Sequence, residues 1–157
     1  KTALYVATVA RTYRKAIDDY LKSPELYREN MEWYKSEIGK CTYREFTTGF
    51  YFHKPDATTQ IYDSNTYVKN YTYLGTVEAV REDGLVRIEQ KNKFSVGETV
   101  EIMKPDGRNL EKEVAAICDE EGNPVESAPH PKQVLYVDLG ADAECGDIIR
   151  RSEMEAD

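Results

Sequence analysis

The stretch KFSVGETVEI occupies residues 93–102, and a shorter echo of it, CGDIIRR, occupies residues 145–151. Each copy places a Gly before an acidic residue and has a β-branched aliphatic residue two positions after the acid. A Gly ahead of a strand allows a turn with positive φ, and the acid can accept backbone hydrogen bonds in that turn. The aliphatic side chains that follow then enter a core in a fixed register. The repeated step therefore favours two strand entries over a ligand-binding turn.

Around these two copies, short alternating runs are separated by turn sequences at nearly even intervals, namely EDG at 82–84, PDG at 105–107, EGN at 121–123 and Gly140. This pattern predicts strands over residues 73–80, 85–90, 99–103, 111–118, 133–139 and 148–150. So many short strands within about eighty residues indicate a small barrel or a sandwich. Because closure leaves fewer unpaired strand edges, we expect a closed β-barrel.

The first forty residues have a different period. Apolar residues recur in steps of three and four over residues 2–21, at Val6, Val9, Tyr13, Ala16 and Tyr20, which predicts an amphipathic helix. Ser23 and Pro24 are typical of the start of a second helix, and Gly39 of its end. A hairpin of two helices buries only one stripe on each, so we expect the remaining apolar surface to pack on a preceding domain.

Between the helices and the alternating strands, FTTGFYFHKP at 46–55 predicts one further strand, and residues 56–73 predict a polar surface loop. The expected organisation is a helical hairpin over 1–40, a strand and connector over 41–72, a β-barrel over 73–151 and a frayed tail over 152–157. The fold class is mainly β with an N-terminal helical hairpin.

The net charge is −8, and residues 41–157 hold thirteen basic and twenty-three acidic side chains. A surface this acidic gains little from counterion release, so binding of nucleic acid would require a local basic patch. Three widely spaced cysteines without a C-x-x-C pair indicate a reducing compartment, the cytoplasm. The sequence contains no run of apolar residues long enough to span a membrane, and its first residue, Lys1, predicts a piece of a longer protein.

No nucleophile–base pair, phosphate-binding Gly-rich loop or cysteine–histidine spacing typical of zinc occurs in the sequence, so we assign no catalytic, cofactor-binding or metal residue. The candidate RNA-contacting residues combine basic side chains with one aromatic near strand ends: Arg87, Lys91, Lys93, Phe94, Arg150 and Arg151. Small barrels bind nucleic acid with such surfaces. Alternatively, the basic residues keep the strand ends soluble, and Phe94 fills the mouth of the barrel.

Four stretches together resemble the C-terminal region of the bacterial collagenase-like peptidases, peptidase family U32. They are YVATVARTYRKAID at 5–18, TTGFYFHKP at 47–55, KNKFSVGETVEI at 91–102 and GNPVESAPHPKQ at 122–133, so the similarity covers nearly the whole chain. The resemblance implies that the helices are the tail of a catalytic domain and that the rest is an appended barrel similar to those of translation factors.

In that family, some members are associated with collagen degradation, and others with hydroxylation of tRNA wobble uridines and an iron–sulfur cluster. The resemblance places these activities and the cluster in the upstream domain, whose signature this sequence lacks. It implies that the fragment is not itself an enzyme but an accessory domain that positions a macromolecular substrate, plausibly tRNA, for the upstream active site. Two alternatives stay open, a domain that docks a peptide or collagen-like chain and a structural brace or dimerisation module.

Overall fold

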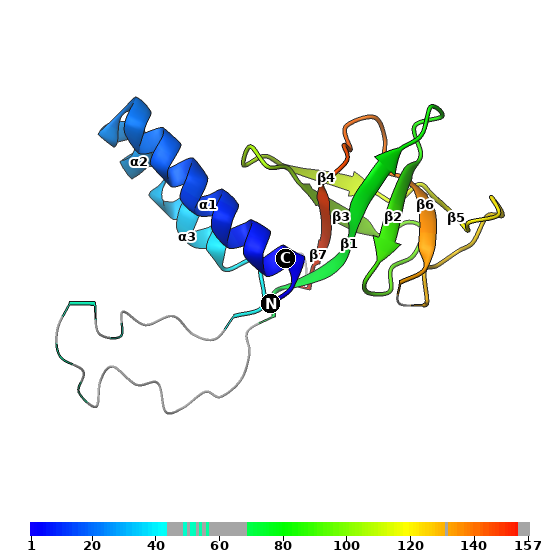
Figure 1. Cartoon of the computed structure of the whole chain (residues 1–157), viewed down its shortest axis with the longest axis horizontal. Helices are drawn as coiled ribbons and strands as arrows, with labels where there is room; N and C mark the ends of the chain where they lie inside the picture. The colour runs from blue at the N-terminus through cyan, green and yellow to red at the C-terminus, as the bar shows by residue number, and fades with distance from the viewer. Residues whose placement is uncertain are drawn as a thin grey trace.

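The structure is a computed structural model that describes residues 1–43, 49, 51, 52, 54, 56, 69–130 and 132–153. Helices lie on one side and a twisted sheet on the other, and the long first helix has its N-terminal end beside the sheet (Figure 1). The predicted strand at 46–55 and the predicted loop at 56–73 fall mostly outside the described residues.

The helical region contains α1 (Ala3–Lys22), α2 (Pro24–Glu29) and α3 (Met31–Ile38). The hydroxyl of Thr2 caps α1 by accepting a hydrogen bond from the backbone N–H of Tyr5, 3.2 Å away. Ser23 caps α2 in the same way, and Pro24 occupies its first turn. The predicted hairpin is present, but its second arm is interrupted at Asn30, which leaves two short helices in place of one.

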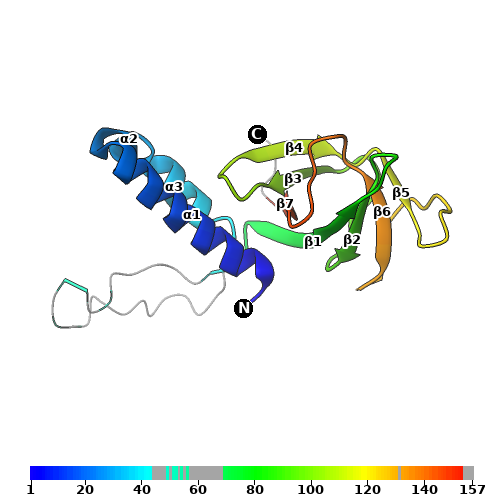
Figure 2. The same ribbon diagram turned by 45° about the horizontal axis from the view of Figure 1, so that its top comes forward.

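The strands are β1 (Tyr71–Val80), β2 (Val86–Gln90), β3 (Thr99–Met103), β4 (Asn109–Glu113), β5 (Ala116–Cys118), β6 (Val134–Asp138) and β7 (Ile148–Ser152). They form one sheet in the order β4-β3-β7-β1-β2-β6-β5, with every neighbouring pair antiparallel. The sheet curls strongly around its inner face (Figure 2). The mainly β fold class is confirmed.

The prediction of a closed barrel is wrong, because β4 pairs only with β3 and β5 pairs only with β6. The predicted strand 111–118 divides at Val114 and Ala115, where the chain leaves one edge of the sheet and joins the other. Val114 donates its N–H to Glu98, whereas Ala115 donates its N–H to Asp138. The two edges of this half-barrel are thus connected by the chain itself and not by a hydrogen-bonded ladder.

The curl depends on β1, the strand that pairs with both β2 and β7. Its register shifts between Tyr73 and Gly75 on the β7 side and between Val77 and Ala79 on the β2 side. Such bulges bend a strand and increase its twist. A Cβ atom at Gly75 would lie 2.8 Å from the backbone oxygen of Glu89, so only glycine allows the approach of β2 at this bend.

The two Gly–acid steps do form strand entries. Gly97 and Gly146 have φ values of 83° and 94°, a backbone region that strongly favours glycine. Asp147 accepts a hydrogen bond from the backbone N–H of Glu144 at 2.8 Å, as expected for an acid in a turn. The carboxylate of Glu98 in the first step lies 2.6 Å from Arg151 and so pairs with a side chain.

The main core lies inside the curled sheet, and its buried residues all fall between Leu74 and Ile149. A second, smaller cluster lies between α1 and the outer face of the sheet and contains Leu4, Cys41, Met103 and Ile148. No described helix residue belongs to the main core, so the sheet has a core of its own. At the end of the sheet, Ser152 pairs with Tyr71 and Glu153 donates to Asn70, whereas a frayed tail was expected from residue 152.

Candidate functional site

The six residues predicted to contact RNA do not form one surface. Arg87 lies on the outer face of β2, Lys91 and Lys93 follow that strand, and Arg151 lies on β7. These four side chains reach solvent, whereas Phe94 belongs to the main core and Arg150 is fully buried beneath the helices. Neither of the two buried residues is available to an RNA in this structure.

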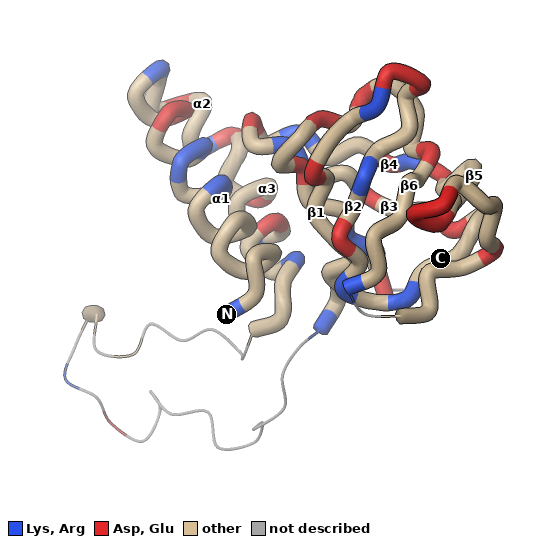
Figure 3. Tube along the Cα trace, turned by 45° about the vertical axis from the view of Figure 1, so that its right-hand side comes forward, with Lys and Arg blue, Asp and Glu red and all other residues tan. Residues whose placement is uncertain are grey.

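Three of these four basic residues, Arg87, Lys91 and Arg151, are paired with carboxylates. Arg87 lies 3.5 Å from Glu78, and Lys91 lies 2.7 Å from Glu89. Basic and acidic residues are interspersed over the sheet (Figure 3). Exposed ion pairs contribute only about 0–1 kcal/mol each, so a phosphate group can replace such a carboxylate at little cost. The surface can therefore accommodate phosphate groups, but its electrostatic potential is not strongly positive.

Two residues that the sequence reasoning missed adjoin Arg87. Tyr136 of β6 is the cross-strand partner of Arg87, and the guanidinium of Arg81 lies 4.8 Å from the centre of the Tyr136 ring. We call Arg81, Arg87 and Tyr136 the outer patch. Tyr136 is partly exposed, and an aromatic ring beside a guanidinium group can stack an unpaired base while a neighbouring arginine contacts its phosphate. The signal was present in the alternation of β6, where Tyr136 lies between the buried Leu135 and Val137.

Lys93 belongs to a separate polar hollow beside the turn that contains Gly97. The hollow has a volume of about 450 Å³ and is lined by Lys93, Ser95, Val96, Glu126 and Ser127. Its side chains offer one cation, one carboxylate and two hydroxyls, which suits hydrogen bonding but provides no activated nucleophile.

A cluster of buried charges joins the helices to the sheet. The carboxylate of Glu37 in α3 pairs with Arg11 of α1 and accepts a hydrogen bond from Arg150 of β7 at 2.6 Å. Arg150 also pairs with Glu101 of β3, and Lys40 lies 3.3 Å from Glu37. We call these five residues the charge cluster. Asn109 of β4 completes the surroundings of Glu37 with a hydrogen bond of 2.9 Å.

The centre of the charge cluster is closed to solvent, since the side chains of Arg11, Glu37 and Arg150 expose 4%, 1% and 0% of their surface. Burial alone would raise the pKa of Glu37, but the charges of Arg150 and Arg11 outweigh it and lower that pKa below its usual range. A carboxylate held ionised and inaccessible cannot serve as a general acid, so this arrangement acts as a connection between elements.

The cysteines do not gather into a site. Cys41 lies in the small cluster under α1, Cys118 is on β5, and Cys145 lies near the backbone oxygen of Glu78. Among the residues that the structure describes, no group of three or more His, Cys, Asp or Glu side chains could hold a metal ion. These residues do not fit an iron–sulfur cluster. None of the described helices has the length and apolar character needed to cross a membrane.

The described residues therefore form a half-barrel domain joined to a helical segment by buried charges. The sequence model of the Peptidase family U32 C-terminal domain matches residues 69–150, and that of Peptidase family U32 matches residues 1–61. The chain belongs to peptidase family U32, as the resemblance had indicated. The boundary between the two matches falls between the helices and the sheet.

Curated relatives extend this comparison. The chain is 34% identical to tRNA hydroxylation protein P1 of Bacillus subtilis over 140 residues, covering 88% of this chain and 33% of that protein. It is 27% identical to tRNA hydroxylation protein P of Escherichia coli, covering 92% of this chain and 31% of that protein. The chain thus spans about a third of the length of these relatives.

A solved structure also matches part of the chain. It is the selenomethionine variant of the C-terminal domain of a Geobacillus thermoleovorans protein assigned to the U32 peptidases. The match has 26% sequence identity and a TM-score of 0.47, and it covers 51% of this chain and 99% of that one.

Proposed function

We propose that residues 69–153 are a non-catalytic accessory domain that contacts tRNA and presents it to an active site elsewhere in the full-length protein. The observation that carries the proposal is that relatives named tRNA hydroxylation proteins match along 88% and 92% of this chain. The outer patch supplies a suitable contact surface. Catalytic residues, and any iron–sulfur cluster, would belong to the two thirds of the relatives that this chain does not cover, and the location would be the cytoplasm, where tRNA is found.

The outer patch suits a single-stranded or looped region of tRNA better than a double helix. RNA bases are read mainly where they are unstacked, because aromatic and guanidinium planes can then stack on them. The guanidinium of Arg81 lies over the ring of Tyr136, Arg87 is the cross-strand neighbour of Tyr136, and both arginine side chains are partly exposed. Lys91, which directly follows β2, adds a second position for phosphate contact.

The test is tRNA binding by the full-length protein as a function of salt concentration. Replacing Arg87 with Glu should weaken binding and reduce the slope of log K against log salt by roughly 0.7–0.9 per lost phosphate contact. Arg28→Glu is the matched control, since Arg28 is an exposed arginine of α2 paired with Glu25. Tyr136→Ala should weaken binding without changing the salt slope. Equal affinities and slopes for all three variants and the parent would reject the proposal.

The charge cluster favours a second role, that of a brace. Its ion pairs link strands β3 and β7 to helices α1 and α3, and Asn109 of β4 adds a hydrogen bond to Glu37. Such a connection suits a domain that holds its neighbour in a fixed orientation. Under this role alone, variants of the outer patch would leave tRNA binding intact, and variants of the charge cluster would lower the melting temperature. The two sets of variants thus separate the two roles.

A further inference from the structure

The outward face of α1 is apolar. Among the described residues, nine large hydrophobic side chains are exposed, and five of them lie on this one helix: Val6, Tyr13, Ile17, Tyr20 and Leu21. At 100° per residue, these positions span about 100° of the helix circumference, so they form one continuous stripe. We call them the α1 stripe.

The buried side of α1, which packs on the sheet and on the other two helices, is in contrast largely polar. Its buried residues are Leu4, Thr8, Arg11, Thr12 and Asp19. A surface helix normally turns its apolar stripe toward the core and its charges toward solvent. In α1 the arrangement is inverted, since ion pairs and hydrogen bonds lie on its buried side and the apolar side is uncovered. The hydrophobic surface of this helix therefore requires another partner.

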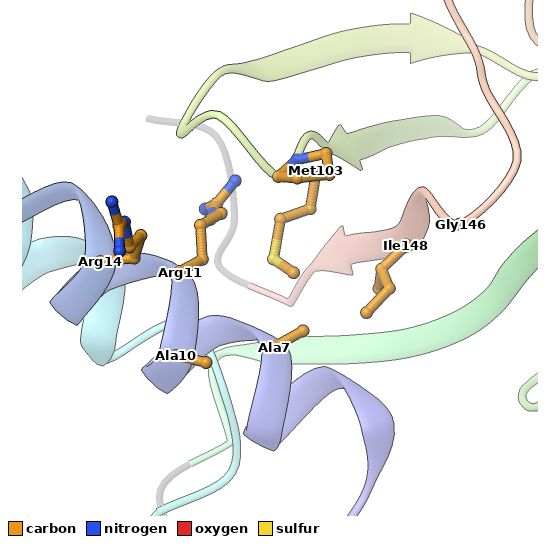
Figure 4. Close-up of a pocket in the computed structure, with 8 residues that line it drawn as sticks. Ala7, Ala10, Arg11, Arg14, Met103, Gly146 and Ile148 are labelled. Carbon is orange, nitrogen blue, oxygen red and sulfur yellow. The ribbon is translucent and has the colours of Figure 1, made fainter.

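Two hollows flank the α1 stripe. One, of about 330 Å³, lies between α1 and the sheet, with Ala7 and Ala10 on the helix side and Met103 and Ile148 on the sheet side (Figure 4). The other, of about 210 Å³, lies between α1 and the pair α2 and α3 and is lined in part by Tyr13, Ala16, Tyr27 and Met31. A ridge of side chains between two grooves is the surface that helix packing uses.

We propose that the α1 stripe and its two flanking hollows are the docking surface for the rest of the Peptidase family U32 domain of the same polypeptide. The family match at residues 1–61 assigns the helices to that domain, and the relatives are about three times as long as this chain. The helices also contribute nothing to the main core of the sheet, so their own core has to come from elsewhere. A second copy of the chain would not explain why the stripe falls within the segment that matches the other domain.

This docking has a structural consequence. One side of α1 is attached to the sheet through the charge cluster, and the other side would be attached to the catalytic domain through the α1 stripe. A single helix would then be a wall shared by both domains. The accessory domain is therefore held in one orientation and is not carried on a flexible linker. This inference stands whether or not the sheet contacts tRNA.

The test is hydroxyl-radical footprinting of the full-length protein, with each residue compared between the native and urea-denatured protein. Tyr13 and Tyr20 should be protected severalfold, approaching the buried Tyr34, although they are 61% and 55% exposed in the structure described here. Val96, 42% exposed on the sheet side, should show little protection. Tyr13 and Tyr20 reacting as freely as Val96 would overturn the proposal. Protection that vanishes on dilution would overturn the proposal in favour of a second copy of the chain. Protection that appears only when tRNA is added would overturn it in favour of RNA.

A pair of variants provides an independent check. Ile17→Glu introduces a charge into the stripe, and Val80→Glu introduces the same charge at a sheet residue of similar exposure, 52% against 48%. In the full-length protein, Ile17→Glu should remove the protection of Tyr13 and Tyr20 and increase proteolysis around the helices. Val80→Glu should do neither. Equal effects of the two substitutions would contradict docking at the stripe.

Discussion

Replacing Glu37 with Gln should destabilise the protein more than any other change of one charge on the helices. The substitution keeps the shape of the side chain but removes the carboxylate shared by Arg11 and Arg150. Both guanidinium groups would stay buried, with Glu101 as the remaining acid of the charge cluster. Water cannot compensate them, because the side chains of Arg11 and Arg150 are almost fully covered.

Breaking a buried ion pair by removing one partner costs about 3–5 kcal/mol, because the remaining charge stays desolvated. For a chain of this size, such a loss lowers the melting temperature by roughly 6–20 °C. The double variant Glu37→Gln/Arg150→Gln should lose less than the sum of the two single variants, since the second change removes one of the uncompensated charges.

The assay is thermal and urea unfolding followed by circular dichroism. Glu32→Gln is the control, because Glu32 lies on the same helix in an exposed pair with Lys35 and should change stability by less than about 0.5 kcal/mol. If the free energies of unfolding of Glu37→Gln and Glu32→Gln differ by less than about 1 kcal/mol, the charge cluster does not hold the helices to the sheet.

Three further predictions concern titration and a second buried pair. The pKa of Glu37 is lower in the folded protein than in the unfolded chain, where it is about 4.3. The ionised carboxylate therefore stabilises the fold above that unfolded pKa, and this stabilisation is lost as the pH falls through the folded pKa. Glu37→Gln should lack this acid-dependent loss of stability in a pH titration of unfolding. Asp147→Asn should lower the free energy of unfolding by about 3 kcal/mol, since it leaves the buried ammonium of Lys104 with only the exposed Glu144. Its control in urea unfolding is Asp142→Asn, which breaks an exposed pair with Lys112. Burial and a hydrogen bond to Asp19 raise the pKa of Tyr34 to about 12, so in absorbance titration the Tyr34→Phe variant should lack the last phenol to ionise; an unchanged final step would contradict this.

The local features of the sheet followed from the sequence. Turn residues and period-two alternation located five of the strands to within about two residues, and the repeated Gly–acid step predicted strand entries at Gly97 and Gly146. These signals are local, because positive φ and alternating burial depend on the residues themselves and their near neighbours. The break of the second helical arm at Asn30 carried no comparable signal and was missed.

Barrel closure could not be predicted, because it depends on where the chain crosses between edges. The run over 111–118 reads as one alternating strand, yet Val114 bonds to one side of the sheet and Ala115 to the other. The first part of this run pairs with β3 and the last part with β6, and that division depends on where these two strands lie in three dimensions. The outer patch has the same origin, since Arg81 and Tyr136 are fifty-five positions apart in the sequence and meet only because the β1–β2 hairpin pairs with β6 through β2.

By itself, the sequence determined the element types, most strand positions and the family, because turn chemistry, hydrophobic period and family motifs are local properties of the chain. Only the tertiary structure decided what each charge does. Arg150 and Arg151 are neighbours in the sequence, yet one is sealed beneath the helices and the other pairs with Glu98 at the surface. Successive residues of a strand point to opposite faces, and which face is covered depends on the helix that packs there.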